Sequence, residues 1–446
     1  MSRTHAELVA YNKQFTFAGW TSTNDWNPVS MVKAEGVYFW DADDKKYLDW
    51  SSQLVNVNVG HGHPHVIKAI QEQITKISAA HPGIATEPRA VLGEMLSKVM
   101  PGDMNKVFYT LGGAEAIENA MKFARQYTGR QKILARYRAY HGATFASMMA
   151  GGDPRRLANE PGVPWVVHLP DPYAYRAPYY RGHTVDEGEA IVADMIEEIV
   201  QFEGPGNIAA IMLEGYSGTS GIIQGGEVFW NRVQEICDTY KILLIVDEVM
   251  SGFGRTGEWF AVMHYPKVKP DLMTMAKGLT SGYVPLGAVG VSDKIAAYFE
   301  DHMYWGGLTY GAHPLACAAG VANLEIYHNE KLVDNAREMG KVLHAGLMDL
   351  AEKHPCVGEV RGTGLLQMME LVKNRQTREP MSGFNKPMSE PMKKAAASLR
   401  NNGVSTFVRW DYIFSAPPLI VTKDQIGEGL AVLDKALAEV DPYCES

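Results

Sequence analysis

The sequence predicts an α/β fold with a mainly parallel sheet in a large domain, followed by a smaller α+β domain. Apolar runs of five or six residues alternate with amphipathic stretches over most of the chain. The run at residues 242–246 is unbroken and rich in branched side chains, which is typical of strands buried on both faces of a parallel sheet. From about residue 322 the pattern changes to long helices with short strands between them, which predicts the second domain.

The composition is that of an ordinary globular protein, and it argues against several kinds of partner. The chain has 446 residues, of which 46% are hydrophobic and 21% charged, and its formal net charge is −9. The negative charge argues against binding to nucleic acid or to an anionic membrane. No stretch approaches the ~20 apolar residues of a transmembrane helix, and the first residues lack the apolar core of a signal peptide. The four cysteines form no C-x-x-C pair, so we expect neither zinc nor disulfides, and a cytoplasmic location.

The first hundred residues offer few signals. We expect residues 1–34 to form an irregular, aromatic-rich arm that packs on the body, or alternatively to bring Trp20 into a substrate pocket. The turn residues after position 40 predict a hairpin of residues 36–40 and 46–49. Apolar spacing then predicts a helix at residues 64–77.

Three histidines, His61, His63 and His65, lie at the start of that helix and invite a metal-site interpretation. No cysteine or acidic residue stands at ligand spacing beside them in the sequence. We therefore expect a lead-in turn and no metal.

A strand at residues 106–110 leads into the Gly112-Gly113 turn and a helix. Such a turn leaves backbone N–H groups free at a helix N-terminus, where the helix dipole also favours an anion. The pair is therefore a candidate phosphate site, although a glycine pair alone is usually only a turn.

Two later strands each end at a candidate catalytic residue, because the run at 242–246 is followed by Asp247 and the run from Asp271 by Lys277. Ligands of open α/β sheets bind beside the carboxyl ends of the strands. A lysine amine forms a Schiff base with an aldehyde cofactor, and a carboxylate pairs with the pyridinium nitrogen of that cofactor. The alternative is a surface lysine that closes a strand.

The two segments read Asp247-Glu-Val-Met-Ser-Gly-Phe-Gly-Arg-Thr-Gly257 and Ala276-Lys-Gly-Leu-Thr-Ser-Gly-Tyr-Val-Pro-Leu-Gly287. Together they resemble the signature of the class III aminotransferases, which depend on pyridoxal 5′-phosphate (PLP). This family includes the omega-transaminases and the taurine and gamma-aminobutyrate aminotransferases. The resemblance runs from about residue 36 to residue 422 and implies the fold type I architecture of PLP-dependent transferases.

With that architecture we expect three segments. Residues 1–59 would join the small domain, residues 60–321 would form the large PLP-binding domain, and residues 322–446 would form the C-terminal small domain. Residues 151–185 are a Pro- and Tyr-rich excursion that is either functional or interfacial, and residues 374–386 are expected to be a surface loop. Further helices are expected at 186–202, 330–353, 389–401 and 423–439, and strands at 208–213, 287–291, 358–361, 365–371 and 404–408.

The resemblance also implies roles for individual residues around the cofactor. Lys277 would hold PLP and move protons during catalysis, and Asp247 would keep the pyridine nitrogen protonated. Tyr140, in the motif Tyr-His-Gly, would stack on one face of the ring and Val249 on the other. Glu214 would lie near the cofactor, although Gly215 stands where the family commonly has proline.

The remaining implied contacts concern the phosphate and the substrate. Gly113 and Ala114 would hold the cofactor phosphate, and Thr309 would reach the phosphate of the neighbouring subunit. Arg409, shortly before Pro-Pro-Leu, would grip a substrate carboxylate with its planar guanidinium; a plain surface arginine is the alternative. Val55 matches a position where relatives often carry a tryptophan that narrows the substrate pocket.

We therefore expect an enzyme that moves an amino group from an amine or omega-amino acid to a 2-oxo acid, pyruvate or 2-oxoglutarate, by a ping-pong mechanism. A homodimer with shared active sites, or a tetramer, is expected. A PLP-dependent decarboxylase or aminomutase on the same scaffold is the nearest alternative. A catalytically silent binding protein is the alternative from another class.

Overall fold

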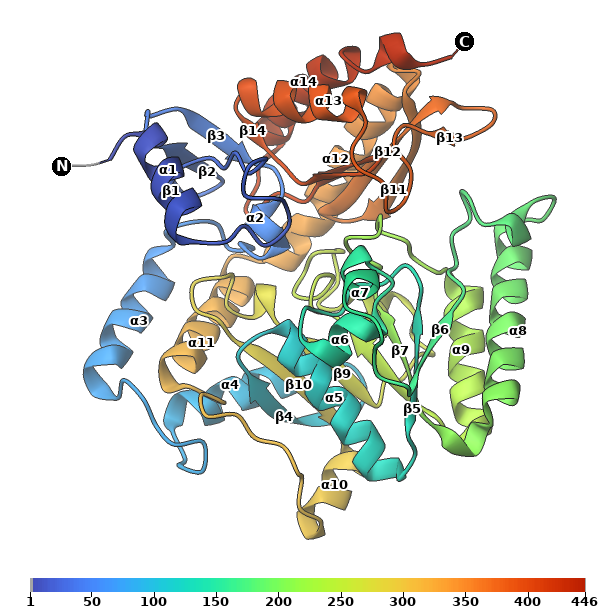
Figure 1. Ribbon diagram of the computed structural model, residues 1–446. Coiled ribbons are helices and arrows are strands. Elements are labelled where there is room, and N and C mark those ends of the chain that lie inside the picture. Colours follow the sequence, from blue (N-terminus) through green and yellow to red (C-terminus); the bar gives the residue numbers. More distant parts are fainter. Residues whose placement is uncertain (1–2, 446) are drawn as a thin grey trace.

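A seven-stranded sheet forms the centre of the large domain, and its strands run in the order β4-β10-β9-β8-β7-β5-β6 (Figure 1). The computed structural model describes residues 3–445. Only β10 runs antiparallel to its neighbours, so the predicted mainly parallel α/β sheet is confirmed. The strands are β4 (Met104–Thr110), β5 (Lys132–Arg136), β6 (Val166–Leu169), β7 (Ile208–Glu214), β8 (Leu243–Asp247), β9 (Leu272–Met275) and β10 (Gly287–Ser292).

Both faces of this sheet are buried, which explains the unbroken apolar runs. In β8, Leu243 and Ile245 face a core shared with helix α5 (Gly113–Thr128), whereas Leu244 and Val246 face the core on the opposite side. Successive side chains of a strand point to opposite faces, so a strand covered on both sides needs apolar residues at every position. Helices α8 (Val185–Glu203) and α9 (Glu227–Tyr240) pack against each other at one side of the sheet (Figure 1).

The N-terminal segment is more regular than the sequence predicts. Helix α1 (His5–Phe15) and all but the last residue of strand β1 (Met31–Glu35) lie within residues 1–34, the stretch expected to be irregular, so that expectation is wrong in part. Helix α1 buries none of its side chains, and therefore it has no apolar periodicity. Its one sequence signal is the capping box formed by Thr4 and Glu7.

The predicted hairpin is confirmed as β2 (Tyr38–Asp41) and β3 (Lys46–Asp49). Strand β3 also pairs in parallel with β14 (Val404–Ser405). The first fifty residues are thereby joined to the C-terminal part of the chain, as the blue and red ribbons at the top of Figure 1 show. The three-segment division of the chain stays a prediction.

The C-terminal part contains the predicted α+β pattern with three differences in detail. The stretch 404–408 is two short strands in different sheets, β14 and β15 (Val408–Arg409), and the expected loop at 374–386 contains β13 (Glu379–Pro380). Strand β16 (Tyr412–Ser415) has no counterpart among the predicted strands. The other elements are α12 (Leu332–Lys353), β11 (Val357–Thr363), β12 (Leu366–Asn374), α13 (Glu390–Asn401) and α14 (Lys423–Ala438).

The excursion at residues 151–185 is ordered and contacts the C-terminal part. It contains α7 (Pro154–Ala158), β6 and the 3-10 helix η1 (Pro178–Tyr180). Arg176 from this excursion forms an ion pair with Glu370 on β12. The remaining helices are α2 (Ser52–Val55), α3 (Pro64–Lys76), α4 (Glu87–Ser97), α6 (Phe145–Ala150), α10 (Asp293–Asp301), α11 (Pro314–Asn329), and the 3-10 turns η2 (Pro205–Asn207), η3 (Ala261–His264), η4 (Lys277–Leu279) and η5 (Asp441–Tyr443).

The three histidines before α3 contact three different carboxylates: His61 lies 2.8 Å from Asp49, His63 2.9 Å from Glu330 and His65 2.5 Å from Glu325. Within residues 3–445, no group of three or more potential metal ligands comes together. In the same range, none of the helices combines the length and the apolar character that crossing a membrane requires.

Arg255 is a fully buried arginine that joins distant parts of the chain. Its side chain is 0% exposed, and burial lowers its pKa to about 10. The guanidinium donates to Asn58 Oδ1 at 2.7 and 3.1 Å and to Ser52 Oγ at 2.7 Å. It also donates to the carbonyl oxygens of Leu365, Ala416 and Pro417.

Replacing Arg255 with methionine is expected to lower the free energy of unfolding by roughly 3–5 kcal/mol, because buried acceptors lose their donor. Urea unfolding at one protein concentration measures this loss. The matched control is Arg232→Met on α9, since Arg232 has three carboxylate partners but is about one-third exposed. Exposed ion pairs are worth less than about 1 kcal/mol, so equal losses in the two variants would contradict this account.

Candidate active site

Two adjoining cavities open at the carboxyl ends of the central strands. The inner one has a volume of about 500 Å³ and the outer one about 490 Å³, and Tyr140 and Lys277 line both. The inner cavity is lined by seven of the predicted site residues: Gly113, Ala114, Tyr140, Glu214, Asp247, Val249 and Lys277. The outer cavity is lined by Trp20, Val55 and Arg409, together with Tyr140 and Lys277. The structure therefore brings ten of the eleven predicted site residues to one place.

Lys277 follows strand β9 and begins the short 3-10 turn η4. Its φ of +40° lies in the left-handed region that side chains other than glycine rarely adopt, and such strain is concentrated at functional sites. Burial lowers the pKa of its amine, opposed by the nearby charges of Asp247 and Glu214. Within the described residues, Nζ has no hydrogen-bond partner, so the amine is free to bind a ligand.

Asp247 ends strand β8, and three donors fix its carboxylate. Oδ1 accepts from the backbone N–H of Val249 and from the hydroxyl of Thr274, both at 3.0 Å. Oδ2 lies 2.7 Å from Nδ1 of His141. The side chains of Asp247 and His141 are both buried. Since an ionised carboxylate only accepts hydrogen bonds, Nδ1 carries the proton, and the buried Nε2 of His141 has no partner among the described residues.

Glu214 lies beside Asp247, because the two residues are paired in register on β7 and β8. Its Oε1 accepts from the N–H of Tyr140 at 3.0 Å and its Oε2 from the N–H of Gly218 at 2.6 Å. Burial raises the pKa of Glu214, and His141 opposes this shift. Glu214 thereby fixes both the backbone of Tyr140 and the turn that follows β7.

The inner cavity also includes the N-terminus of α5. This helix begins at Gly113 after the N-cap Gly112, and no side chain caps it, so its first N–H groups are available to an anion. A Cβ at Gly113 would lie 2.8 Å from Cγ1 of Val249. Glycine at this position therefore lets the helix end approach the strand ends closely.

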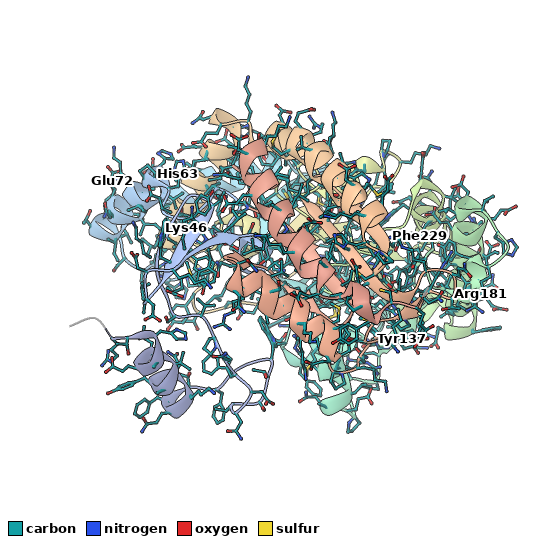
Figure 2. All side chains as sticks on the ribbon, turned by 90° about the horizontal axis from the view of Figure 1, so that it is seen from above. Lys46, His63, Glu72, Tyr137, Arg181 and Phe229 are labelled. Atoms are coloured by element: carbon teal, nitrogen blue, oxygen red, sulfur yellow. The ribbon has the colours of Figure 1, made fainter. Side chains whose placement is uncertain are left out.

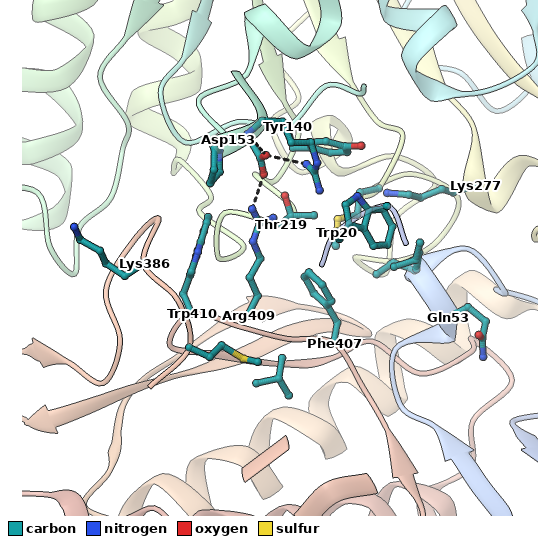
Figure 3. A pocket seen from close by; sticks show the side chains of 18 residues that line it. Trp20, Gln53, Tyr140, Asp153, Thr219, Lys277, Lys386, Phe407, Arg409 and Trp410 are labelled. Atoms are coloured by element: carbon teal, nitrogen blue, oxygen red, sulfur yellow. Dashed lines mark hydrogen bonds and ion pairs between the residues drawn. The ribbon is translucent and has the colours of Figure 1, made fainter. Parts of the chain in front are cut away.

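The outer cavity contains an ion-paired cluster that the sequence analysis missed. Asp153 lies between two guanidinium groups, with its Oδ2 2.5 Å from Arg409 and its Oδ1 3.0 Å from Arg155 (Figure 3). Arg155 also covers the ring of Tyr140, at 4.6 Å from guanidinium carbon to ring centroid, and approaches the ring of Trp20 at 5.7 Å. No motif surrounds Arg155 in the sequence, so only the fold reveals it.

Thr309 is the predicted residue that lines neither cavity. It is exposed, in the segment between α10 and α11. His141 and Thr274, which both contact Asp247, are not among the predicted site residues. His141 had one available signal, its place next to Tyr140 in the Tyr-His-Gly motif; Thr274 had none, because it lies inside an apolar strand.

These residues fit PLP. A lysine amine on a half-buried side chain, a buried carboxylate held by three donors, an uncapped helix N-terminus and an aromatic ring all border one cavity. They match, in turn, the aldehyde, the pyridine nitrogen, the phosphate and the ring face of that cofactor.

Comparison with known proteins decides the family. The family model described as Aminotransferase class-III matches residues 21–437. The chain belongs to this family. As a class-III aminotransferase it is an enzyme of fold type I that uses PLP, so the predicted family, fold and cofactor are confirmed.

The class-III aminotransferase is similar to several characterised proteins over nearly its whole length. It is 35% identical to the taurine–pyruvate aminotransferase of Bilophila wadsworthia, over 99% of both chains. It is 34% identical to the putrescine–pyruvate aminotransferase of Pseudomonas aeruginosa, over 94% of this chain and 93% of the relative. Among solved structures, the taurine:2-oxoglutarate aminotransferase of Bifidobacterium kashiwanohense, in complex with PLP and glutamate, is 42% identical over 99% of both chains, with a TM-score of 0.95.

Proposed function

We propose that this aminotransferase takes its amino group from an omega-amino acid with a distal acidic group, of the taurine type, and passes it to pyruvate or 2-oxoglutarate. The observation that carries the proposal is the pair of guanidinium groups, Arg155 and Arg409, in the cavity that opens onto Lys277. One carboxylate, Asp153, lies between them. Transamination itself is the activity of the family, and the choice of substrate is what we add.

The charge of the outer cavity favours an anionic substrate group. Arg155, Arg409 and Lys386 line it, with Asp153 as the one acidic residue among the described lining. A carboxylate or sulfonate entering this cavity finds two planar donors that bind two oxygens at once. The other walls, which include Val55 and Trp20, are largely apolar and suit the carbon chain of the substrate.

The residues of the inner cavity then have distinct tasks. PLP, when bound, supplies the electron sink that lets a proton leave the carbon beside the amine. Lys277 holds the cofactor at rest and, once released, takes and returns that proton as general base and acid. Asp247, fixed by its three donors, keeps the ring nitrogen protonated. Tyr140 and Val249, which both line the cavity, would hold the ring from its two faces.

The residues of the inner cavity also account for the binding of the cofactor phosphate and for the second half of the reaction. Gly113 and Ala114 offer N–H groups at the N-terminus of α5 to the phosphate, and Glu214 holds the segment that carries Tyr140. The amino group would stay with bound PLP between the two half-reactions: water would release the carbon skeleton of the donor as a carbonyl compound, and the 2-oxo acid would then enter the same cavity, take up the amino group and return the water. Donor and acceptor thus alternate at one site, which gives ping-pong kinetics.

Each active site is proposed to be completed by a second copy of the chain, in a homodimer or a tetramer. Thr309 is exposed and lies away from both cavities, and large apolar side chains near it are exposed as well: Met303 at 66%, Trp305 at 74% and Tyr310 at 61%. Such a group of apolar side chains is typical of a protein interface. We also propose a cytoplasmic location and the division of each subunit at residues 59/60 and 321/322.

The test is a panel of donors added to the holoenzyme without a 2-oxo acid, followed by absorbance. Donors with a distal carboxylate or sulfonate are expected to discharge the cofactor band faster than neutral amines of the same length. In Arg155→Met and Arg409→Met, kcat/KM for acidic donors is expected to fall roughly 10- to 100-fold, because a charge-assisted pair is lost.

The neutral amine serves as the internal control, since its kcat/KM should change little in either variant. Equal losses for acidic and neutral donors would contradict the proposed substrate class. A band that no amine discharges, with carbon dioxide released from amino acids and no need for an acceptor, would favour the decarboxylase instead.

A further inference from the structure

A third cavity, of about 640 Å³, lies away from the active site between two parts of the chain. One wall is formed by residues 174–185, at the end of the excursion that the sequence analysis left without a role. The other wall is formed by residues 376–378, which connect β12 to β13. The cavity shares no lining residue with either active-site cavity. A ligand held here contacts both walls at once.

Three guanidinium groups and an imidazole surround this third cavity. Arg176, Arg181, His183 and Arg378 line it, and among the described lining residues there is no aspartate or glutamate. Arg181 and Arg378 are exposed, and neither has a carboxylate within ion-pair distance in the described part of the chain. Figure 2 shows Arg181 at the outer edge of the molecule. Nη1 of Arg378 donates to the carbonyl oxygen of Tyr175, and the charges of both guanidinium groups remain available to an anion from solution.

The residues that line the cavity also include unpaired hydrogen-bond donors. Three of its buried polar atoms have no partner among residues 3–445: Nη2 of Arg176 and the hydroxyl groups of Tyr175 and Tyr180. All three carry a hydrogen to donate. Buried donors are usually paired, but each of these three atoms is screened from solvent, so they are unused donors within the wall, and the exposed guanidinium groups are the ones that face a ligand.

We propose that this third cavity binds a phosphate-bearing small molecule, at a site separate from that of the cofactor. Guanidinium groups bind phosphate oxygens in pairs, which is what Arg181 and Arg378 offer from opposite walls. The volume lies within the ~300–1,000 Å³ of small-molecule sites and exceeds that of a free phosphate ion. The ligand is therefore a phosphate ester of metabolite size.

Binding at this site joins the excursion to the small domain more firmly. Arg176 belongs both to the cavity wall and to a buried network of charged side chains. Its Nε pairs with Glu370 on β12, and its Nη2 has no partner among the described residues. Glu370 also pairs with Arg361 at 2.6 Å and accepts from the hydroxyl of Tyr173. An anion bound by Arg181 and Arg378 beside this network links the two walls of the cavity, so occupancy stabilises the folded holoenzyme.

The experiment uses the holoenzyme, in which the cofactor already fills its own phosphate site. Inorganic phosphate and glucose 6-phosphate are titrated by calorimetry and by thermal unfolding, with sodium chloride at the same ionic strength as reference. Both phosphates are expected to bind saturably and raise the Tm, with the ester binding more tightly. In Arg181→Gln/Arg378→Gln the affinity for both is expected to fall roughly tenfold or more.

The matched control is Lys267→Gln/Lys435→Gln, which removes the same charge from exposed positions elsewhere. Unchanged affinity in the control and normal transaminase activity in both double variants support the site. Equal binding by the two double variants, or a response that sodium chloride reproduces, would overturn it. Equal affinity for free phosphate and ester would overturn the inference that the ligand is larger than phosphate.

Discussion

Replacing Lys277 with alanine is expected to lower turnover by at least about 10⁴-fold, because the variant loses the group that both holds the cofactor and moves the proton. The fold should remain, since Nζ has no hydrogen-bond partner in the described structure and a truncated side chain only enlarges the inner cavity. Single-turnover kinetics measure the chemical step, and near-ultraviolet circular dichroism and the Tm measure the fold.

Two controls separate the chemistry of Lys277 from general damage. Lys267→Ala removes a lysine that is exposed and outside both active-site cavities, and it should retain full activity. The Lys277→Ala variant should still bind PLP through Asp247 and the N-terminus of α5, but the absorbance band should shift because the link to the lysine is gone. A variant with near-normal turnover would refute the role given to Lys277.

Those features of the fold that depend on local patterns could be predicted from the sequence. The strands ending at Glu214, Asp247 and just before Lys277 are buried on both faces, so an unbroken apolar run identifies each of them. Helix α1 was missed because it buries no side chain. Strands of two residues, such as β14 and β15, are too short to show a period of their own, and β14 also pairs with β3, which is far away in the sequence.

In the candidate site, too, only residues that belong to a local sequence pattern could be predicted. Residues at strand ends or in glycine turns, such as Asp247 and Gly113, could be placed because those positions meet at one edge of a sheet. The contact between His141 and Asp247 joins residues 106 positions apart, and that between Asp153 and Arg409 joins residues 256 apart. No local pattern encodes such pairs. They follow from the path of the whole chain.

Replacing Asp247 with alanine is expected to lower turnover by about 10³-fold, because the buried anion that keeps the ring nitrogen protonated is lost. The decisive measurement is a rescue. The apoprotein of Asp247→Ala is loaded with a PLP analogue methylated at the ring nitrogen, which is cationic without a carboxylate partner. Alanine leaves room for the methyl group, so turnover should recover more than the variant achieves with PLP.

The two side chains that hydrogen-bond to Asp247 provide a further test of its role. His141 and Thr274 act through the carboxylate, so His141→Asn and Thr274→Val should lose less turnover than Asp247→Ala, and both should shift the pH dependence of the cofactor absorbance. A role of His141 in packing alone would leave that pH dependence unchanged. Failure of the methylated analogue to rescue Asp247→Ala, with the analogue shown to be bound, would mean that the carboxylate acts by position and not by charge.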